Sequence, residues 1–377
     1  MKVIKMAAIP AALLVALTGC ATGGSAQDGA TGGSAQDGAG LTTMKVGISP
    51  FQDTYLPIIG TEKGWFEEVG LDVQFQSLAW NAVMPVVASG DIDLAVYATT
   101  GVVATANADP EVVYAYAWNF FTEGAAMMVR PDGGIKSVED LEDESTDRDA
   151  ARDAAVRQLK GKTIVTTLST DMGKTVVDAL ESVGLTQDDV ELIDMDTDAG
   201  LAAFLAGTGD AYLGGIAQRA TALKNGMVAA ITGVDLSAPV INGAVMKRSY
   251  LESNKDDVLA FVNVMHRIIR FCDAELDECG KIITDRLNEE TAGGLTVEAF
   301  KDYWQKLELY ASNAQESSDM ALSKDGISYW KTTWDGDNKY LVETGAIPAE
   351  VESAEHFLMP EVWDEYVAKY GIDETGF

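Results

Sequence analysis

Side chains that carry out chemistry are scarce in this sequence. Its 377 residues include two histidines and three cysteines. His266 lies in a helical pattern and His356 in a loop, too far apart to predict a catalytic pair. The sequence also lacks a glycine-rich phosphate loop, a nucleophile elbow and a metal-ligand spacing. We therefore expect a protein that is not an enzyme and that needs neither a metal nor a cofactor.

Positive charge is scarce as well. Lys and Arg number 27 against 59 Asp and Glu, so the net charge is −32. Such an excess repels phosphate backbones and anionic membrane surfaces, which excludes nucleic acid as an expected partner. A solvated acidic surface and a site that attracts cations would both produce this composition, and both explanations stay open at this point.

Long hydrophobic runs are missing beyond the N-terminus. Lys2 and Lys5 precede the apolar run Met6–Leu17, which is too short to span a membrane and has the form of a signal peptide. It ends in Leu17-Thr18-Gly19-Cys20, which resembles a bacterial lipobox. That resemblance implies a signal peptide over residues 1–19 and a lipid on the thiol of Cys20. We expect a lipid-anchored protein on the outer face of the cytoplasmic membrane, at the cell surface or in the periplasm.

A duplicated segment follows the lipobox. ATGGSAQDGA is followed at once by TGGSAQDGAG, and both are rich in glycine and small polar residues. Such a composition is typical of a flexible linker, and about twenty such residues reach roughly 25 Å. We expect residues 20–43 to be a tether between the lipid and the folded body.

The two remaining cysteines, Cys272 and Cys279, lie within one helical pattern. On an uninterrupted helix they would be about 10 Å apart, which is too far for a disulfide. A bond therefore requires the helix to break near Ala274–Asp277. An oxidising compartment favours the bond, but the sequence leaves both states open.

The body of the chain alternates between strand and helix patterns. Leu78–Gly101 and Ala203–Arg219 share one order: an apolar helix, a glycine turn at Gly90 or Gly207, and a buried strand. The repetition favours two similar α/β lobes. We expect further strands at 44–48, 72–76, 112–118, 125–129, 163–167, 190–193, 229–231 and 240–246, and helices at 172–183, 256–270, 281–287, 297–310 and 327–344.

Four segments carry a resemblance to a known family. They are YLPIIGTEKGWFEEVGLDVQF, VVASGDIDLAVY, LKGKTIVTTLSTDMGKTVVDALESVGLTQDDVELIDM and AAFLAGTGDAYLGG. Together, behind a lipobox, they resemble the solute-binding proteins of ABC importers, in the branch that serves nitrate, taurine, aliphatic sulfonates and thiamine-type pyrimidines. The similarity covers Met44 to about Gly371.

This resemblance implies an α/β periplasmic-binding-protein fold of type II. Each of two lobes would be a mixed sheet flanked by helices, with the ligand cleft between them. We expect lobe 1 at residues 44–130 and 240–377, and lobe 2 at 131–239. The sequence departs from the family in a charged insertion at 142–158, which we expect to be a solvated surface helix. It also has Gln218-Arg219 where relatives often have a proline.

A cleft of this type receives strand ends and helix N-termini from both lobes. From lobe 1 we expect Phe51, Gln52, Asp53, Trp80, Asn81, Tyr97, Thr99, Thr100, Trp118 and Asn119 to bind ligand. From lobe 2 we expect Ser169, Thr170, Asp171, Gly214, Gly215 and Gln218. At least one of the two tryptophans is expected to stack on the ligand.

These residues leave the charge of the ligand open. Aromatic residues beside Asp53 and Asp171 favour an amine-bearing or nitrogen-heterocyclic solute, which closure of the lobes would capture for ABC permease subunits. A sulfonate or taurine-like solute, bound by hydroxyls and Arg219, is the nearest alternative. A pyrimidine-precursor biosynthetic enzyme, whose Cys-Cys-Cys-Phe-Cys run is absent here, and a sensory protein are alternatives of other classes. We expect a monomer.

Overall fold

The computed structural model describes residues 40–144, 147–291 and 294–377. The expected signal peptide, Cys20 and the tether as far as residue 39 lie outside the described residues. Within these three ranges, no helix combines the length and the apolar character needed to cross a lipid bilayer.

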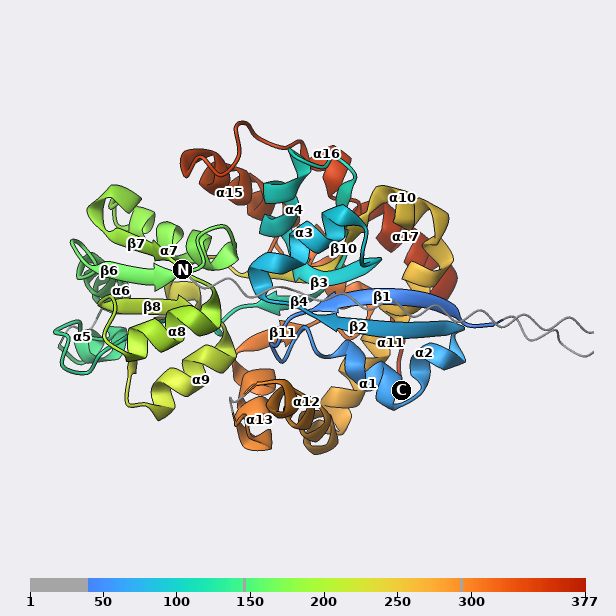
Figure 1. The fold of residues 1–377 in the computed structure, drawn as a ribbon, viewed down its shortest axis with the longest axis horizontal. Helices are drawn as coiled ribbons and strands as arrows, with labels where there is room; N and C mark the ends of the chain where they lie inside the picture. Colours follow the sequence, from blue (N-terminus) through green and yellow to red (C-terminus); the bar gives the residue numbers. More distant parts are fainter. Residues whose placement is uncertain (1–39, 145–146, 292–293) are drawn as a thin grey trace, which may run out of the picture. The chain divides into compact units, whose positions relative to one another are not determined.

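Two mixed sheets form the framework (Figure 1). Over the described residues the first sheet has six strands in the order β11-β4-β10-β3-β1-β2. Their bounds are β1 (Thr42–Ile48), β2 (Leu71–Ser77), β3 (Leu94–Ala98), β4 (Val112–Phe121), β10 (Val240–Lys247) and β11 (Glu308–Tyr310). The second sheet has five described strands in the order β7-β6-β8-β5-β9. Their bounds are β5 (Ala126–Val129), β6 (Thr163–Thr166), β7 (Glu191–Asp194), β8 (Ala211–Gly214) and β9 (Val228–Thr232).

Helices cover both faces of each sheet. Those from the first part of the chain and from the C-terminal part are α1 (Pro57–Glu62), α2 (Trp65–Glu68), α3 (Val83–Ser89), α4 (Thr99–Ala106), α10 (Arg248–Ser253), α11 (Lys255–Ala274), α12 (Leu276–Glu290), α13 (Val297–Lys306), α14 (Ala314–Ser317), α15 (Trp330–Glu343), α16 (Ser353–His356) and α17 (Met359–Tyr370). Those between β5 and β9 are α5 (Val138–Glu144), α6 (Arg148–Arg157), α7 (Asp171–Ser182), α8 (Thr197–Leu205) and α9 (Ile216–Lys224). Short helical turns occur at η1 (Trp80–Ala82), η2 (Gln187–Asp189), η3 (Gly233–Asp235) and η4 (Ser318–Leu322).

Strand β3 shows why the first sheet is covered on both faces. Successive side chains of a strand point to opposite faces. Leu94 and Val96 pack into the core that contains α1 and α11, whereas Ala95 and Tyr97 pack into the core that contains α3 and α4 (Figure 1). A strand buried on both faces reads as an uninterrupted apolar run, as this one does.

The repeated helix–turn–strand pattern is present in both sheets. Gly90 ends α3 with a φ of 78°, and Gly207 follows α8 with a φ of 109°. This left-handed region disfavours residues that have a Cβ atom. Each turn leads to a strand, β3 or β8, and then to the helix that starts at its end, α4 or α9.

The chain changes sheet earlier than the sequence indicates. We expected residues 44–130 to stay in lobe 1, but Ala126–Val129 pairs antiparallel with β8 and β9 in the second sheet. The first crossing is therefore 122–125 and the return crossing is 233–239. The backbone N–H of Gly233 donates to the carbonyl of Ala125 at 2.9 Å, so the two crossings lie side by side.

Three other expectations differ from the structure. β1 begins at Thr42, within the expected tether. The helix expected over 297–310 ends at Lys306, because Glu308–Tyr310 pairs with the end of β4 as a strand. In the insertion, α6 is not simply a solvated helix, since its Ala151, Ala155 and Val156 are buried in the core. Residues 145–146 of the insertion lie outside the described residues.

Cys272 and Cys279 are joined by a disulfide, with their Cα atoms 5.1 Å apart. α11 ends at Ala274 and α12 begins at Leu276, so the helical path breaks at Glu275, which has φ −123° and ψ 51°. This break shortens the distance that an unbroken helix would impose.

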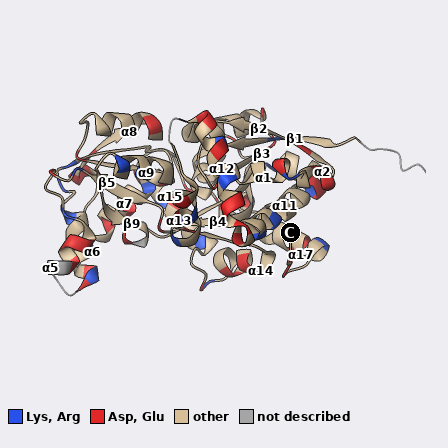
Figure 2. Ribbon diagram, turned by 90° about the horizontal axis from the view of Figure 1, so that it is seen from below, with Lys and Arg blue, Asp and Glu red and all other residues tan. Residues whose placement is uncertain are grey.

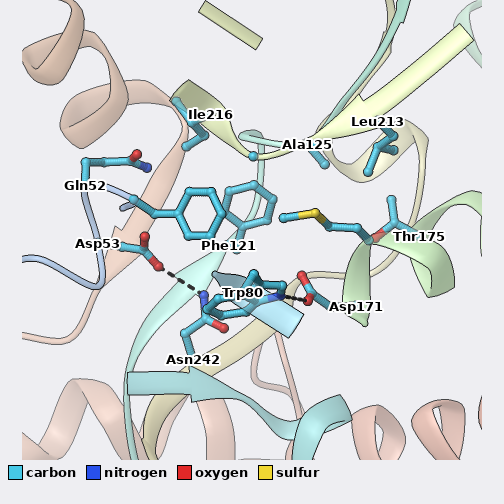
Figure 3. A pocket seen from close by; sticks show the side chains of 14 residues that line it. Gln52, Asp53, Trp80, Phe121, Ala125, Asp171, Thr175, Leu213, Ile216 and Asn242 are labelled. Carbon is cyan, nitrogen blue, oxygen red and sulfur yellow. Dashed lines mark hydrogen bonds between the residues drawn. The ribbon is translucent and has the colours of Figure 1, made fainter. Parts of the chain in front are cut away.

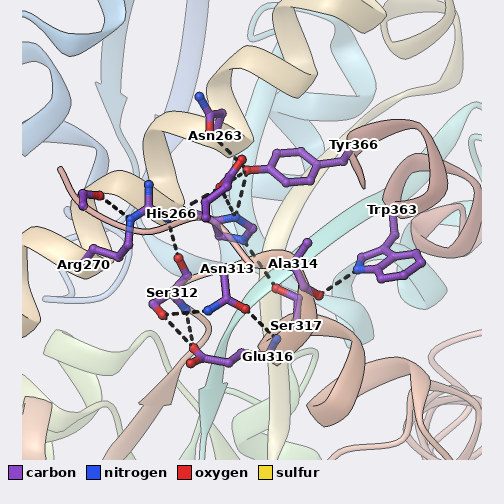
Figure 4. Close-up of polar contacts among 12 residues, drawn as sticks. Asn263, His266, Arg270, Ser312, Asn313, Ala314, Glu316, Ser317, Trp363 and Tyr366 are labelled. Atoms are coloured by element: carbon purple, nitrogen blue, oxygen red, sulfur yellow. Dashed lines mark hydrogen bonds and ion pairs between the residues drawn. The ribbon is translucent and has the colours of Figure 1, made fainter. Parts of the chain in front are cut away.

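Both histidines are buried and hydrogen-bonded within the fold. His266 is fully buried, and its Nδ1 lies 3.0 Å from the Tyr366 hydroxyl (Figure 4). The same hydroxyl donates to Glu374 at 2.7 Å, which fastens the C-terminal segment to α17. Burial lowers the pKa of His266, which favours its neutral form. His356 is also buried, and its Nδ1 lies 2.8 Å from the carbonyl oxygen of Val112.

Acidic residues are spread over outer helices rather than gathered in one place. Figure 2 shows Asp and Glu on α2, α6 and α12, with Lys and Arg among them. Many form exposed ion pairs, such as Lys63–Glu278 at 2.5 Å and Lys301–Asp277 at 2.6 Å. Exposed pairs of this kind contribute little to stability.

Removing the disulfide tests its contribution to stability. We expect Cys272→Ser with Cys279→Ser to lower the free energy of unfolding by about 2 kcal/mol, the lower end of the usual range, because the bond closes a short loop. Urea unfolding of oxidised wild type and variant measures the difference. An unchanged midpoint would show that the bond adds nothing to stability.

Trp118 provides a second stability test. It is fully buried on β4, where its ring packs near that of Phe261. We expect Trp118→Ala to destabilise the fold by about 3–5 kcal/mol, because it leaves a large cavity in the core. Thermal unfolding monitored by circular dichroism measures this loss. A melting temperature equal to that of wild type would contradict the core assignment.

Candidate ligand-binding site

A small cavity lies between the ends of the two sheets (Figure 3). Its volume is about 30 Å³, enough for the centres of roughly two water-sized molecules. From the first sheet and its loops it is lined by Phe51, Gln52, Asp53, Trp80, Phe121 and Asn242. From the crossing and the second sheet it is lined by Ala125, Asp171, Met172, Thr175, Leu213, Gly214, Gly215 and Ile216.

The loop after β1 presents three of these residues. The Thr54 hydroxyl bonds to the carbonyl oxygen of Ser49 and accepts from the Ser49 backbone N–H at 3.2 Å. The backbone N–H of Phe51 donates to the same Ser49 carbonyl at 2.7 Å. These bonds close a tight turn at the carboxyl end of β1. The turn aims Phe51, Gln52 and Asp53 at the cavity.

Trp80 connects the two sheets. Its ring stacks on Tyr97, with centroids 3.9 Å apart, and meets the edge of Phe51 at 5.4 Å. The Tyr97 hydroxyl donates to the Trp80 carbonyl at 2.9 Å, which fixes η1 against β3. The indole Nε1 donates to Asp171 Oδ1, at the start of α7, at 3.0 Å. This hydrogen bond joins the first-sheet side of the cavity to the second.

Three buried carboxyl groups lie at or just behind the cavity surface. Asp53 and Asp171 line it, and Glu308 lies behind Gln52 and Asn119. Burial raises the pKa of all three groups. The charge of Asp171 raises the pKa of Asp53 further, and the charge of Asp53 raises that of Glu308.

No basic side chain balances these acids inside the cavity. Among the described residues that line it, none is Lys, Arg or His. Lys174, whose charge acts on Asp171, bonds to Asp178 at 2.5 Å instead. Arg219 donates to the carbonyls of Glu123 and Gly124 in the first crossing.

A chain of side-chain amides joins the carboxyl groups. Gln52 Nε2 donates to Glu308 Oε1 at 2.6 Å, and Asn119 Nδ2 donates to Glu308 Oε2 at 3.0 Å. Asn242 Nδ2 donates to Asn119 Oδ1 at 3.0 Å and to Asp53 Oδ2 at 3.3 Å. Within the described part of the chain, the buried oxygens Gln52 Oε1 and Asn242 Oδ1 accept no hydrogen bond. Two of the amides that line the cavity thus each carry an oxygen without a hydrogen-bond partner among the described residues.

The structure brings together about half of the residues expected to bind ligand. The residues that line the cavity are Phe51, Gln52, Asp53, Trp80, Asp171, Gly214 and Gly215. Tyr97 and Asn119 stand directly behind them, in contact with Trp80 and with Asn242.

The other expected residues lie elsewhere. Asn81 and Ser169 are exposed. Thr170 is the N-cap of α7, and its hydroxyl accepts from the N–H of Met172 at 3.2 Å. Gln218 donates to Asp198 at 2.8 Å. Trp118 does not line the cavity, because it points into the core beneath the first sheet.

The helix start at which Thr99 and Thr100 were expected to bind ligand already faces a carboxylate from the protein itself. Thr99 and Thr100, at the start of α4, donate their hydroxyls to Asp337 on α15, each at 2.8 Å. Asp337 is buried, which raises its pKa to about 6. These hydroxyls are therefore occupied in the structure.

Sequence reasoning missed several residues that line or support the cavity. Asn242 could have been found as a polar residue within the apolar strand VINGAVM. Glu308 carried no such signal, because the pattern around it predicted a helix. The apolar lining residues, such as Phe121, Met172 and Ile216, read only as ordinary core.

Comparison with known proteins agrees with this architecture. The model of the NMT1-like family matches residues 37–283. The aliphatic sulphonate binding protein SsuA from Escherichia coli is 13% identical with a TM-score of 0.62, covering 84% of this chain and 91% of its own. The nitrate-binding protein NrtA from Synechocystis PCC 6803 is 16% identical with a TM-score of 0.63, covering 88% and 89%.

An enzyme shares the fold as well. The desulfurization enzyme DSZB is 12% identical with a TM-score of 0.55, covering 87% of this chain and 99% of its own. No curated protein sequence matches the chain. Similarities at these identities establish the fold and not the ligand. The family match spans more than half of the sequence, and both sheets have their counterpart in these structures; the chain thus belongs to the NMT1-like family and has a periplasmic-binding-protein fold.

Proposed function

We propose that this protein captures a small, positively charged nitrogen compound outside the cytoplasm and delivers it to the permease of an ABC importer. The observation that carries the proposal is the cavity itself: Asp53 and Asp171 line it, its amides Gln52 and Asn242 each have an oxygen without a partner, and no described lining residue is basic. A buried carboxylate is costly unless it is paired. An ammonium or protonated ring nitrogen would supply both the charge and the missing donors.

The fold supports a role in capture and release. SsuA and NrtA, which share this fold, bind an aliphatic sulphonate and nitrate. In this chain we infer that the two sheets belong to two lobes, which move about the paired crossings 122–125 and 233–239. The cavity of about 30 Å³ is too small for most organic solutes. Entry therefore requires the lobes to separate and the Trp80–Asp171 hydrogen bond to break.

Gly233 suits a hinge of this kind. Its φ is 53°, and a Cβ atom placed there would lie 2.8 Å from the backbone Cα of Glu123. Only glycine lets the return crossing approach the first one so closely.

The aromatic residues favour the same class of ligand. Trp80, Phe51 and Phe121 line the cavity beside the acids. The face of an aromatic ring attracts cations, and carboxylates nearby add to that attraction. Such a combination would hold an amine-bearing or heterocyclic cation.

The nearest alternative is a sulfonate or taurine-like solute. The hydroxyls that would bind an anion at the start of α4 already donate to Asp337, and Arg219 is occupied by backbone carbonyls. An anion in the cavity would also face Asp53 and Asp171. These observations favour the cation, whereas the sulfonate-binding neighbours alone would favour the anion.

Enzymatic turnover is an alternative of another class, because DSZB shares the fold. We propose binding without turnover, since the lining residues that the structure describes include no activated nucleophile beside a base. Mass spectrometry of a compound before and after incubation separates the two: a binder returns it unchanged.

The N-terminal features complete the proposal. We infer a signal peptide over residues 1–19, a lipid on Cys20 and a flexible tether. Together they would hold a monomeric body at the outer face of the cytoplasmic membrane, near its permease. Metabolic labelling with palmitate tests this anchor. Wild type should incorporate label, and Cys20→Ala should not.

The proposed ligand class predicts the sign of a pH effect. Because cation binding favours ionised Asp53 and Glu308, affinity for an amine should rise as pH increases from about 6 to about 8. A thermal-shift screen of amines, heterocycles and sulfonates finds the ligand, and calorimetry then gives Kd against pH. We expect Asp53→Asn to weaken amine binding at least tenfold, or about 1.4 kcal/mol, and to reduce the pH effect.

Asp337→Asn is the matched control, since Asp337 is another buried acid but does not line the cavity. It should leave both affinity and pH dependence unchanged. Strong binding of a sulfonate that improves as pH falls would contradict the proposed ligand class.

The aromatic contribution can be tested separately. We expect Trp80→Ala to weaken binding of the identified amine about tenfold, because it removes the ring beside the acids. Trp80→Phe keeps an aromatic face and should retain most of the affinity. Calorimetry on both variants gives the comparison, and full affinity in Trp80→Ala would show that Trp80 does not contact the ligand.

A further inference from the structure

We propose that Glu308 is a positioning residue that holds the side-chain amides of Gln52 and Asn242 with their oxygens free, so that the cavity selects ligands that donate hydrogen bonds. Glu308 is buried on β11 and does not line the cavity itself. The inference rests on the proposed function, because it explains how the protein would prefer an ammonium to an anion.

The first connection runs through Gln52. An amide can rotate by half a turn and exchange its donor with its acceptor, so its orientation depends on its partners. Gln52 Nε2 donates to Glu308 Oε1 at 2.6 Å, which leaves Gln52 Oε1 without a partner among the described residues. The acid thus decides which end of this cavity-lining amide is free.

The second connection runs through two amides in series. Asn119 Nδ2 donates to Glu308 Oε2 at 3.0 Å, so Asn119 Oδ1 is turned toward Asn242. Asn242 Nδ2 donates to that oxygen and to Asp53, which leaves Asn242 Oδ1 as a second free acceptor within the described structure. Glu308 therefore sets the orientation of Gln52 and Asn119, and together with Asp53 that of Asn242.

The Tyr310 hydroxyl keeps this arrangement independent of the proton on Glu308. It bonds to Glu308 Oε2. A hydroxyl can donate to an ionised carboxylate or accept from a protonated one. Gln52 and Asn119 can therefore go on donating in both states.

Replacing Glu308 by glutamine should reverse the orientation of at least one of these amides. If the new amide nitrogen faces Gln52, that side chain must turn and present Nε2 to the cavity. If it faces Asn119, then Asn119 and in turn Asn242 must rotate, and Asn242 presents Nδ2 but loses its bond to Asp53, so the first outcome is favoured. In either case one acceptor at the cavity becomes a donor, with almost no change in shape.

Binding of two probes of similar shape and opposite charge tests the inference on the full mature protein. Calorimetry measures Kd for ethylammonium chloride and for sodium ethanesulfonate with wild type, Glu308→Gln and Asp273→Asn. We expect wild type to prefer ethylammonium and Glu308→Gln to reduce that preference at least tenfold. Asp273→Asn, which neutralises an acid on α11 that bonds to Trp304 and does not line the cavity, should leave the preference unchanged. A Glu308→Gln preference within twofold of wild type would overturn the inference.

Neutron diffraction from deuterated crystals gives a second measurement that needs no ligand. In wild type, deuterium atoms on Gln52 and Asn119 should point to Glu308. In Glu308→Gln at least one of the amides of Gln52, Asn119 and Asn242 should be reversed. Three unchanged orientations in a folded variant would refute the positioning role.

The two measurements separate this inference from the proposed function. A wild-type protein that prefers ethanesulfonate, or binds neither probe, counts against the proposed cationic ligand. The deuterium positions then decide the role of Glu308 by themselves. If wild type prefers ethylammonium while the variant amides keep their orientation, the function stands and the inference fails.

Discussion

The buried hydrogen-bonded network from Asp53 through Asn242, Asn119 and Glu308 to Gln52 is the constraint on which the site depends. It joins the loop after β1 to β4, β10 and β11, so four separate parts of the chain must be in register for it to form. Buried polar groups carry a high cost when unpaired. The two free oxygens and the ionisable acids of this network are therefore the strongest indication of a missing partner.

The fold explains how such a network can exist at the edge of a binding cavity. β4 and β10 are neighbouring interior strands of the first sheet, whereas Asp53 and Asp171 reach the cavity from a loop and from a helix start. Trp80 lies between the sheets, held by Tyr97 on one side and bonded to Asp171 on the other. Residues from both sheets therefore meet at one point, and the lobe movement that we propose would change their contacts together.

Much of the fold could be predicted from the sequence, because burial on both faces, glycine turns and strand ends leave local patterns. The repeat around Gly90 and Gly207 is one example. Sequence patterns also pointed to Phe51–Asp53 and Asp171, which line the cavity, because these residues follow or start predicted elements. Glu308 was missed because its strand is short and pairs with β4 through residues far away in the sequence. Thr99 and Thr100 were assigned to the ligand because nothing local reveals Asp337, which approaches them from α15.

Counting protons exchanged on binding tests the central claim most directly. Calorimetry of one amine in buffers of different ionisation enthalpy gives the number of protons released per ligand bound. Because a cation beside Asp53 and Glu308 lowers their raised pKa values, the account predicts net release near neutral pH. Proton uptake, or no exchange at all, would contradict a cation bound among these buried carboxyl groups.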